Sequence, residues 1–171
     1  MKIFRVLLVC ALFAGCGGDD EEQTATPAKT ETPAAEKTET PAAQDDEAAV
    51  REVFDTYMAA LKEKDFDTAC SQLAPETTEK LQENVKKLGV SDPPETCPGN
   101  LELLQETAEK DEASKKVLEE LYDSAEVDSI KVSGDDSATI DWHASVQGKE
   151  TPVSQSARKI DGEWKLVDVT N

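Results

Sequence analysis

The sequence predicts an α+β fold, with N-terminal helices packed on a curved antiparallel sheet of about four strands. Two observations predict it. Apolar residues first recur at every third or fourth position, as on one face of a helix, and later at every second position, as on one face of a strand. A chain in which helices are followed by a meander of strands has an α+β layout. The sheet is expected to wrap around the first helix.

The helical half begins with a continuous apolar stripe. Asp45 or Asp46 is expected to cap the first helix, with Glu47 in its first turn. The stripe that follows has offsets of 0, 3, 4, 7, 8 and 11, and its members are Val50, Val53, Phe54, Tyr57, Met58 and Leu61. This helix is therefore expected to bury one face against the rest of the domain.

Three further helical segments are predicted before the strands. A short helix carries Phe66, Ala69, Cys70 and Leu73, and Pro75 opens the next one, which stops at Gly89. After the loop SDPPETCPG, apolar positions between residues 101 and 122 predict one long helix or two shorter ones. The polar stretch EKDEASKK favours a break near residues 109–114.

Four strands are expected in the C-terminal half. The first covers residues 127–132, and the second covers residues 138–146, where apolar and polar residues alternate. A third strand follows Gly148, and its Pro152 implies an edge position or a bulge. The pair Asp161-Gly162 predicts a tight hairpin turn into the last strand, EWKLVDVT.

The first sixteen residues are predicted to be an export signal with a lipidation site. Lys2 and Arg5 precede the apolar run 6–14. That run is shorter than the roughly 20 residues that cross a bilayer as a helix, and it fits the core of a secretory signal. Small residues then lead to Cys16, which resembles the lipobox of bacterial lipoproteins, with Phe13 where Leu is usual.

The lipobox resemblance implies that Cys16 is acylated and becomes the first residue of the mature chain. The protein would then be anchored by lipid to the cell membrane, on its extracytoplasmic face. Two alternatives remain at this point: an ordinary cleavable signal peptide with an incidental cysteine, or a signal anchor.

Residues 17–44 are predicted to be a disordered acidic tether, and residues 45–171 the globular domain. The tether is rich in Thr, Pro and Ala, lacks large apolar side chains, and repeats KTETPAA at 29–35 and 37–43. The chain has a net charge of −19, and its globular part has −16. Such a charge repels nucleic acid, so nucleic-acid binding is not expected.

Two of the four cysteines are expected to form a disulfide. With Cys16 lipidated and Cys10 removed with the signal, Cys70 and Cys97 remain as an even pair in an oxidising compartment. A zinc site would need more ligands than two thiols and one distant histidine, and no CxxC motif suggests redox chemistry. The sequence indicates no metal site and no cofactor.

His143 is the only histidine, and it alternates with Asp141 and Ser145 along one strand. Residues two apart on a strand are separated by about 6.5–7 Å, too far for the hydrogen bonds of a hydrolase triad. The opposite face, with Trp142, is the one expected to be buried. The alternative is that His143 and Asp141 point inward as an acid–base pair.

Two segments resemble nuclear transport factor 2-like (SnoaL-like, cystatin-like) domains. They are YMAALKEKDFDTACSQLAPE, near the start of the domain, and KIDGEWKL, at its last hairpin. The resemblance implies a cone-shaped pocket between the sheet and the first helix. The candidate lining residues are Phe54, Tyr57, Met58, Trp142 and Trp164. For the two tryptophans a core position is the main expectation, because they lie at alternating strand positions.

The function expected from these features is that of a tethered extracytoplasmic lipoprotein. Its domain would bind a small apolar ligand or an envelope protein without catalysis. The alternative, also implied by the resemblance, is an isomerase or dehydratase that uses His143 and Asp141 in the pocket.

Overall fold

The computed structural model describes residues 41–90 and 92–167, with the side chains described from residue 44 onward. The predicted signal with Cys16, and nearly all of the predicted tether, lie outside the described residues. In chain order the helices are α1 (Pro41–Glu63), α2 (Phe66–Ser71), α3 (Pro75–Lys87), α4 (Cys97–Glu109) and α5 (Glu112–Ser124). The strands are β1 (Glu126–Ser133), β2 (Ser137–Val146), β3 (Lys149–Ile160) and β4 (Glu163–Val167).

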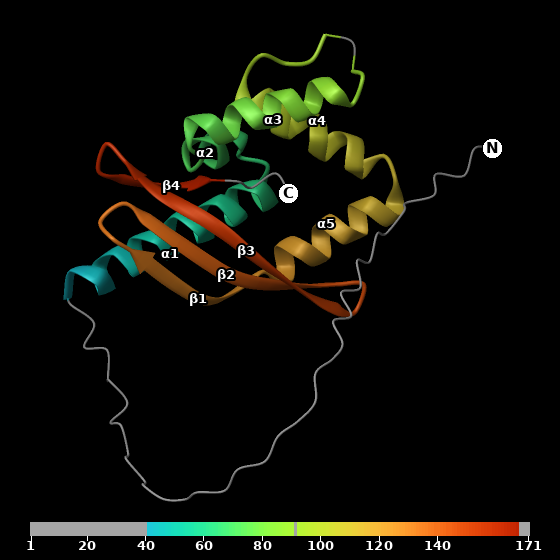
Figure 1. The fold of residues 1–171 in the computed structure, drawn as a ribbon. Coiled ribbons are helices and arrows are strands. Elements are labelled where there is room, and N and C mark those ends of the chain that lie inside the picture. Colours follow the sequence, from blue (N-terminus) through green and yellow to red (C-terminus); the bar gives the residue numbers. More distant parts are fainter. Residues whose placement is uncertain (1–40, 91, 168–171) are drawn as a thin grey trace, which may run out of the picture. The chain divides into compact units, whose positions relative to one another are not determined.

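The α+β prediction is confirmed. The strands form one antiparallel sheet in the order β1-β2-β3-β4, and α1 packs against one of its faces (Figure 1). Helices α2, α3 and α4 pack together, and α5 contacts β2. The main core lies between α1 and the sheet.

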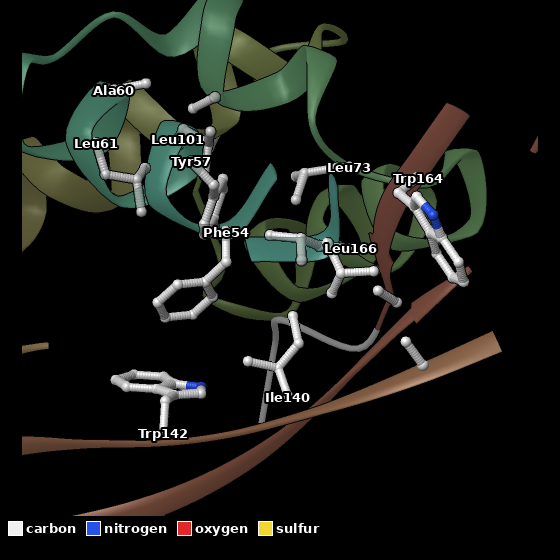
Figure 2. Close-up of a cluster of buried hydrophobic side chains, with 14 of the residues drawn as sticks. Phe54, Tyr57, Ala60, Leu61, Leu73, Leu101, Ile140, Trp142, Trp164 and Leu166 are labelled. Carbon is white, nitrogen blue, oxygen red and sulfur yellow. The ribbon is translucent and has the colours of Figure 1, made fainter. Parts of the chain in front are cut away.

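The centre of this core is closely packed (Figure 2). Val50 and Phe54 of α1 are buried against Ile140 and Trp142 of β2 and Leu166 of β4. The rings of Phe54 and Trp142 have centroids 5.3 Å apart. Each such side chain contributes about 1.5–3 kcal/mol through burial, so this layer stabilises the sheet on α1.

Helix α1 begins earlier than predicted. It starts at Pro41, a residue that is tolerated at the first helical position. Asp46 is therefore inside the helix, and the prediction that it or Asp45 caps the helix is wrong. The Asp46 carboxylate instead accepts hydrogen bonds from Lys159 Nζ at 2.7 Å and Trp164 Nε1 at 3.0 Å. These bonds join α1 to β3 and β4.

The other helix boundaries follow recognisable caps. The carboxylate of Asp65 accepts from Thr68 N at the start of α2, and Pro75 opens α3 as predicted. The predicted break between residues 109 and 114 is confirmed, because α4 ends at Glu109 and Asp111 caps α5.

Two predicted boundaries are wrong. The loop SDPPETCPG ends early, because its last three residues form the first turn of α4. Leu73 follows the end of α2 and pairs with Leu166 instead of extending the helix.

The sheet has the predicted faces and turns. Ile140, Trp142 and Ala144 are buried, and the residues between them face the other side. Asp161 and Gly162 both have positive φ, 52° and 88°, as a two-residue hairpin turn requires. Pro152 pairs with β2 on one side, whereas β4 begins to pair with β3 only at Ser156, so Pro152 lies at a free edge.

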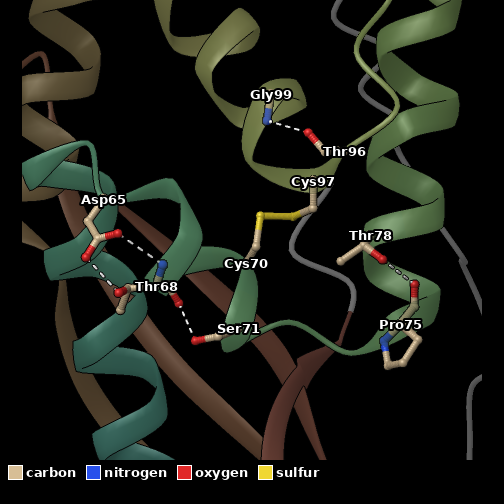
Figure 3. Close-up of a disulfide and its surroundings, with 9 residues drawn as sticks. All are labelled: Asp65, Thr68, Cys70, Ser71, Pro75, Thr78, Thr96, Cys97 and Gly99. Carbon is tan, nitrogen blue, oxygen red and sulfur yellow. Dashed lines mark hydrogen bonds between the residues drawn. A yellow bond between two sulfur atoms is a disulfide. The ribbon is translucent and has the colours of Figure 1, made fainter.

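The predicted disulfide joins Cys70 of α2 to Cys97, the first residue of α4, with their Cα atoms 6.0 Å apart (Figure 3). The following turn is also tied down, because Leu166 N donates to Gln72 O and Ala74 N donates to Leu166 O. This short pairing covers the outer edge of β4. Together the two connections hold the helical group against the end of the sheet.

Candidate functional site: an apolar cavity among four helices

A cavity of about 380 Å³ lies among α1, α3, α4 and α5. Its volume is within the range of small-molecule sites, about 300–1,000 Å³. Most of the side chains around it are apolar. They are Tyr57, Leu61, Leu81, Asn84, Leu88, Leu101, Leu104, Gln105, Ala108, Leu118 and Tyr122.

The lining follows from helical spacing in four separate segments. Leu81 of α3 and Leu88, the residue that follows the end of α3, are seven residues apart, and Leu118 and Tyr122 are four apart on α5, so each pair shares one face. Because the four apolar faces converge, they enclose a common space. Leu88 is 59% exposed although it lines the cavity, which places it at the opening.

The polar groups of this mostly apolar lining are the amides of Asn84 and Gln105 and the hydroxyls of Tyr57 and Tyr122. Gln105 of α4 is only 9% exposed, and its Nε2 donates to Glu109 Oε1 at 3.1 Å. Its Oε1 is buried and has no hydrogen-bond partner among the described residues. An unpaired buried acceptor costs about 1–3 kcal/mol. This oxygen has almost no accessible surface, so it does not face the open part of the cavity.

The carboxylate beside Gln105 is held in its ionised form. Lys64 Nζ lies 2.8 Å from Glu109, and the hydrogen bond from Lys64, followed by that from Gln105, lowers the pKa of Glu109. Burial raises the pKa of the two lining phenols, Tyr57 and Tyr122. Both tyrosines therefore present neutral hydroxyl groups at neutral pH.

Helix α4 supplies several lining residues, and its start is fixed by three features (Figure 3). Thr96 Oγ1 accepts from Gly99 N at 3.3 Å as the helix cap. A Cβ at Gly99 would lie 2.7 Å from Pro94 Cβ, so only glycine fits there. The Cys70–Cys97 disulfide then ties the same turn to α2. The cavity wall is thus attached covalently to the rest of the fold.

The predicted location of the pocket is wrong. Of the five candidate lining residues, only Tyr57 lines the cavity. Phe54 is a buried core residue, and Met58 is half-buried against the same core. Trp142 and Trp164 are core residues too, as the main expectation for them had it. Between α1 and the sheet these large side chains occupy the space where the resemblance placed a cone (Figure 2).

The proposed acid–base pair does not face a pocket. Asp141 and His143 lie on the sheet face opposite Trp142, as the main prediction had it. His143 Nδ1 is 2.8 Å from Asp128 Oδ1, and this bond raises the pKa of His143. Asp128 lies at a β-bulge of β1, where the pairing register shifts. The inward-facing alternative for His143 is contradicted.

The hydrogen-bond partners of Asp141 differ from those of His143. Its carboxylate accepts from Lys131 Nζ at 2.8 Å, Ser154 Oγ at 2.9 Å and Ser129 Oγ at 3.2 Å. These bonds lower the pKa of Asp141, that from Lys131 most of all. The pair therefore stabilises neighbouring strands by two independent sets of contacts.

Sequence reasoning missed the helical cavity, although one signal was present. Along α4, Leu101, Leu104 and Ala108 are at offsets 0, 3 and 7, and Gln105 fills offset 4 on the same face. A glutamine inside a buried stripe indicates a polar function or a partner. The remaining lining leucines look like ordinary core residues.

The described residues contain neither a membrane-spanning helix nor a cluster of metal ligands. No helix within 41–90 and 92–167 is long and apolar enough to cross a membrane. Across the same ranges there is no group of three or more metal-ligating side chains.

Comparisons with known proteins give structural similarity but no match to a family model or a curated protein. The fold is similar to the crystal structure of an NTF-2 like protein of unknown function from Shewanella oneidensis MR-1, with a TM-score of 0.40. The two share 14% sequence identity, over 70% of this chain and 92% of that chain. A similarity of this size carries no inference about activity.

Proposed function

We propose that the domain is a non-catalytic binding domain for a small apolar ligand, held by a lipid anchor on Cys16 outside the cytoplasmic membrane. The observation that carries the ligand proposal is the 380 Å³ cavity with its mostly apolar lining. Sites for small molecules typically combine an apolar lining with a few polar groups that fix orientation.

The nuclear transport factor 2-like group is the fold family in which we place the domain. The support is the order of its elements and the two segments YMAALKEKDFDTACSQLAPE and KIDGEWKL. Within that proposal the chain differs in the position of its cavity, which lies among helices instead of beneath the sheet.

Native mass spectrometry of the full chain tests the ligand proposal. We expect a copurified small molecule, or saturable uptake of added octanol. Ala108→Trp should abolish both, because the indole occupies the cavity that Ala108 lines. Thr107→Trp is the matched control, since Thr107 is exposed on the same helix and is not a lining residue. Equal uptake by both variants would contradict the proposal.

The anchor is tested independently of the ligand. We expect the chain to fractionate with membranes and to begin at Cys16 with added acyl mass. Cys16→Ser should remove that mass and release the protein, whereas Cys10→Ser should leave the lipidated mass unchanged. An unmodified mature chain that begins at residue 16 would disprove the anchor and leave the cavity proposal intact.

A protein partner is the second candidate, and one observation favours it. Leu88, at the opening of the cavity, is 59% exposed, and a partner could insert an apolar side chain beside it. Leu88→Asp would then weaken capture of the partner by about tenfold, the effect of losing one buried apolar contact of ~1.4 kcal/mol. Uptake of octanol by the purified chain supports the small ligand instead.

A further inference from the structure

The chain contains only two tyrosines, and both line the cavity. Tyr57 comes from α1 and Tyr122 from α5, so they reach it from different helices. Tyr57 is only 7% exposed, although a buried phenol usually has a hydrogen-bond partner for its hydroxyl. No hydrogen bond joins either hydroxyl to another of the described residues. The two phenols are therefore free to bind a group in the cavity.

Both hydroxyls are accessible, which distinguishes them from the Gln105 oxygen. Within the described part of the chain, the fully buried side-chain polar atoms without a partner belong to Asn100, Gln105, Trp142 and Gln155. Neither tyrosine is among them, so both hydroxyls retain accessible surface. Because Tyr57 is almost entirely enclosed and lines the cavity, the surface that its hydroxyl retains faces that space.

The two phenols lie near enough to affect each other. Burial raises the pKa of Tyr57, and the neighbouring Tyr122 phenol raises it further. Both hydroxyls therefore stay protonated at neutral pH and can donate. A carbonyl oxygen has two lone pairs, so it can accept from two donors at once, and it brings no hydrogen that would need an acceptor in an apolar cavity. The tyrosine pair matches such an oxygen.

The charge beside the cavity disfavours an anionic ligand. Burial raises the pKa of Tyr122, and the ionised carboxylate of Glu109 raises it further. A negative charge at the Tyr122 hydroxyl is therefore unfavourable, whether it belongs to the phenol or to a ligand. A carboxylate head is repelled at this position, whereas a neutral carbonyl oxygen is not.

We infer that the cavity binds uncharged apolar carbonyl compounds, such as ketones, esters or lactones, and that Tyr57 and Tyr122 are the two donors that hold the carbonyl oxygen. This inference rests on the proposed function and adds the ligand class to it. The leucines of the lining surround the hydrocarbon part of the ligand.

Carbon-13 NMR tests the inference on the full chain carrying Cys16→Ser, which prevents acylation. The probe is 2-octanone labelled at its carbonyl carbon, whose resonance moves to higher frequency when the oxygen accepts hydrogen bonds. At saturation we expect the bound resonance to lie clearly above that of 2-octanone dissolved in octane. In calorimetric titration, octanoate should bind about tenfold more weakly than 2-octanone because it is charged.

Two variants assign the effect to the hydroxyls. Tyr57→Phe and Tyr122→Phe each remove one oxygen and keep the ring, so each should move the bound resonance toward its value in octane. Each should also weaken 2-octanone binding about fivefold, the usual effect of losing one neutral hydrogen bond. The control, Thr107→Val, removes an exposed hydroxyl of α4 outside the cavity lining and should leave both the resonance and the affinity unchanged.

The outcomes separate the inference from the proposed function. If bound 2-octanone has the same resonance as in octane, the inference is overturned while the ligand proposal stands. A shifted resonance that survives in the double variant Tyr57→Phe, Tyr122→Phe also overturns it, because another donor, such as the Asn84 amide of the lining, then holds the carbonyl. Octanoate that binds as tightly as 2-octanone overturns the restriction to uncharged ligands. If neither 2-octanone nor octanol binds in a saturable way, the inference and the proposed function fail together.

Discussion

His143 offers the sharpest prediction at the scale of single residues. Its bond to Asp128 raises the pKa, and because it is the only histidine, proton NMR follows it as one resonance. We expect the measured pKa to lie above 6.5, and Asp128→Asn should return it toward that ordinary value. Asp128→Glu, which keeps the charge, should preserve part of the shift.

The sign of the effect on stability follows from the raised pKa. The charged imidazole is favoured in the folded state, so the stabilisation is fully present below pH 6.5. It is lost as the pH rises through the higher pKa of the folded state. Thermal unfolding of the His143→Gln variant should show no such loss. A titration at or below the ordinary value would contradict the ion pair.

Single residues also show what the sequence could and could not predict. The alternation around Trp142 was enough to identify the buried face, because a strand has only two faces. The partner of His143 was not predictable, because Asp128 reaches it from a bulge that depends on the pairing register. The contacts of Asp46 were not predictable for a related reason. Its partners Lys159 and Trp164 lie more than a hundred residues away in the sequence.

At the scale of elements, the disulfide determines how firmly α4 forms the cavity wall. Replacing both Cys70 and Cys97 with serine should lower the free energy of unfolding by about 3.5 kcal/mol, the chain-entropy value for a loop of this length. Octanol affinity should fall too, because α4 supplies Leu101, Leu104 and Gln105 to the site. Urea unfolding and calorimetry measure the two effects.

A matched control separates the covalent bond from the side chains. The unsubstituted protein, unfolded under reducing conditions, should lose the same stability as the double variant, whereas the variant itself should not respond to the reductant. If reduction left the free energy of unfolding unchanged, the disulfide would not restrict the unfolded chain as loop-closure entropy requires.

The arrangement of the helices also explains why the cavity could not be predicted from the sequence. The stripes of α3, α4 and α5 predict helices that bury one face. This was correct for α3 and α4, whereas the apolar residues of α5 are only half-buried. Periodicity does not give the distances between those faces. Leucines that meet in full contact and leucines that leave 380 Å³ between them have the same pattern. Conversely, Phe54, a candidate pocket residue, fills the core, where it packs directly on Trp142.

At the scale of the whole molecule, the net charge of −19 makes a prediction about salt. Excess negative charge destabilises the compact state through self-repulsion, and salt screens it over a Debye length of about 10 Å at 0.1 M. Exposed ion pairs such as Lys62–Asp123 oppose this trend, because salt weakens them too. Each is worth only about 0–1 kcal/mol, so the uncompensated acids should dominate.

We therefore expect the unfolding temperature to rise by about 2–4 °C between low salt and 0.15 M sodium chloride, or ~1 kcal/mol for a chain of this size. Differential scanning calorimetry measures it. A triple variant with Glu52→Gln, Glu83→Gln and Glu106→Gln removes three exposed charges and should respond less. A fall in unfolding temperature with salt would show instead that the ion pairs, such as Lys131–Asp141 across the sheet, outweigh the repulsion.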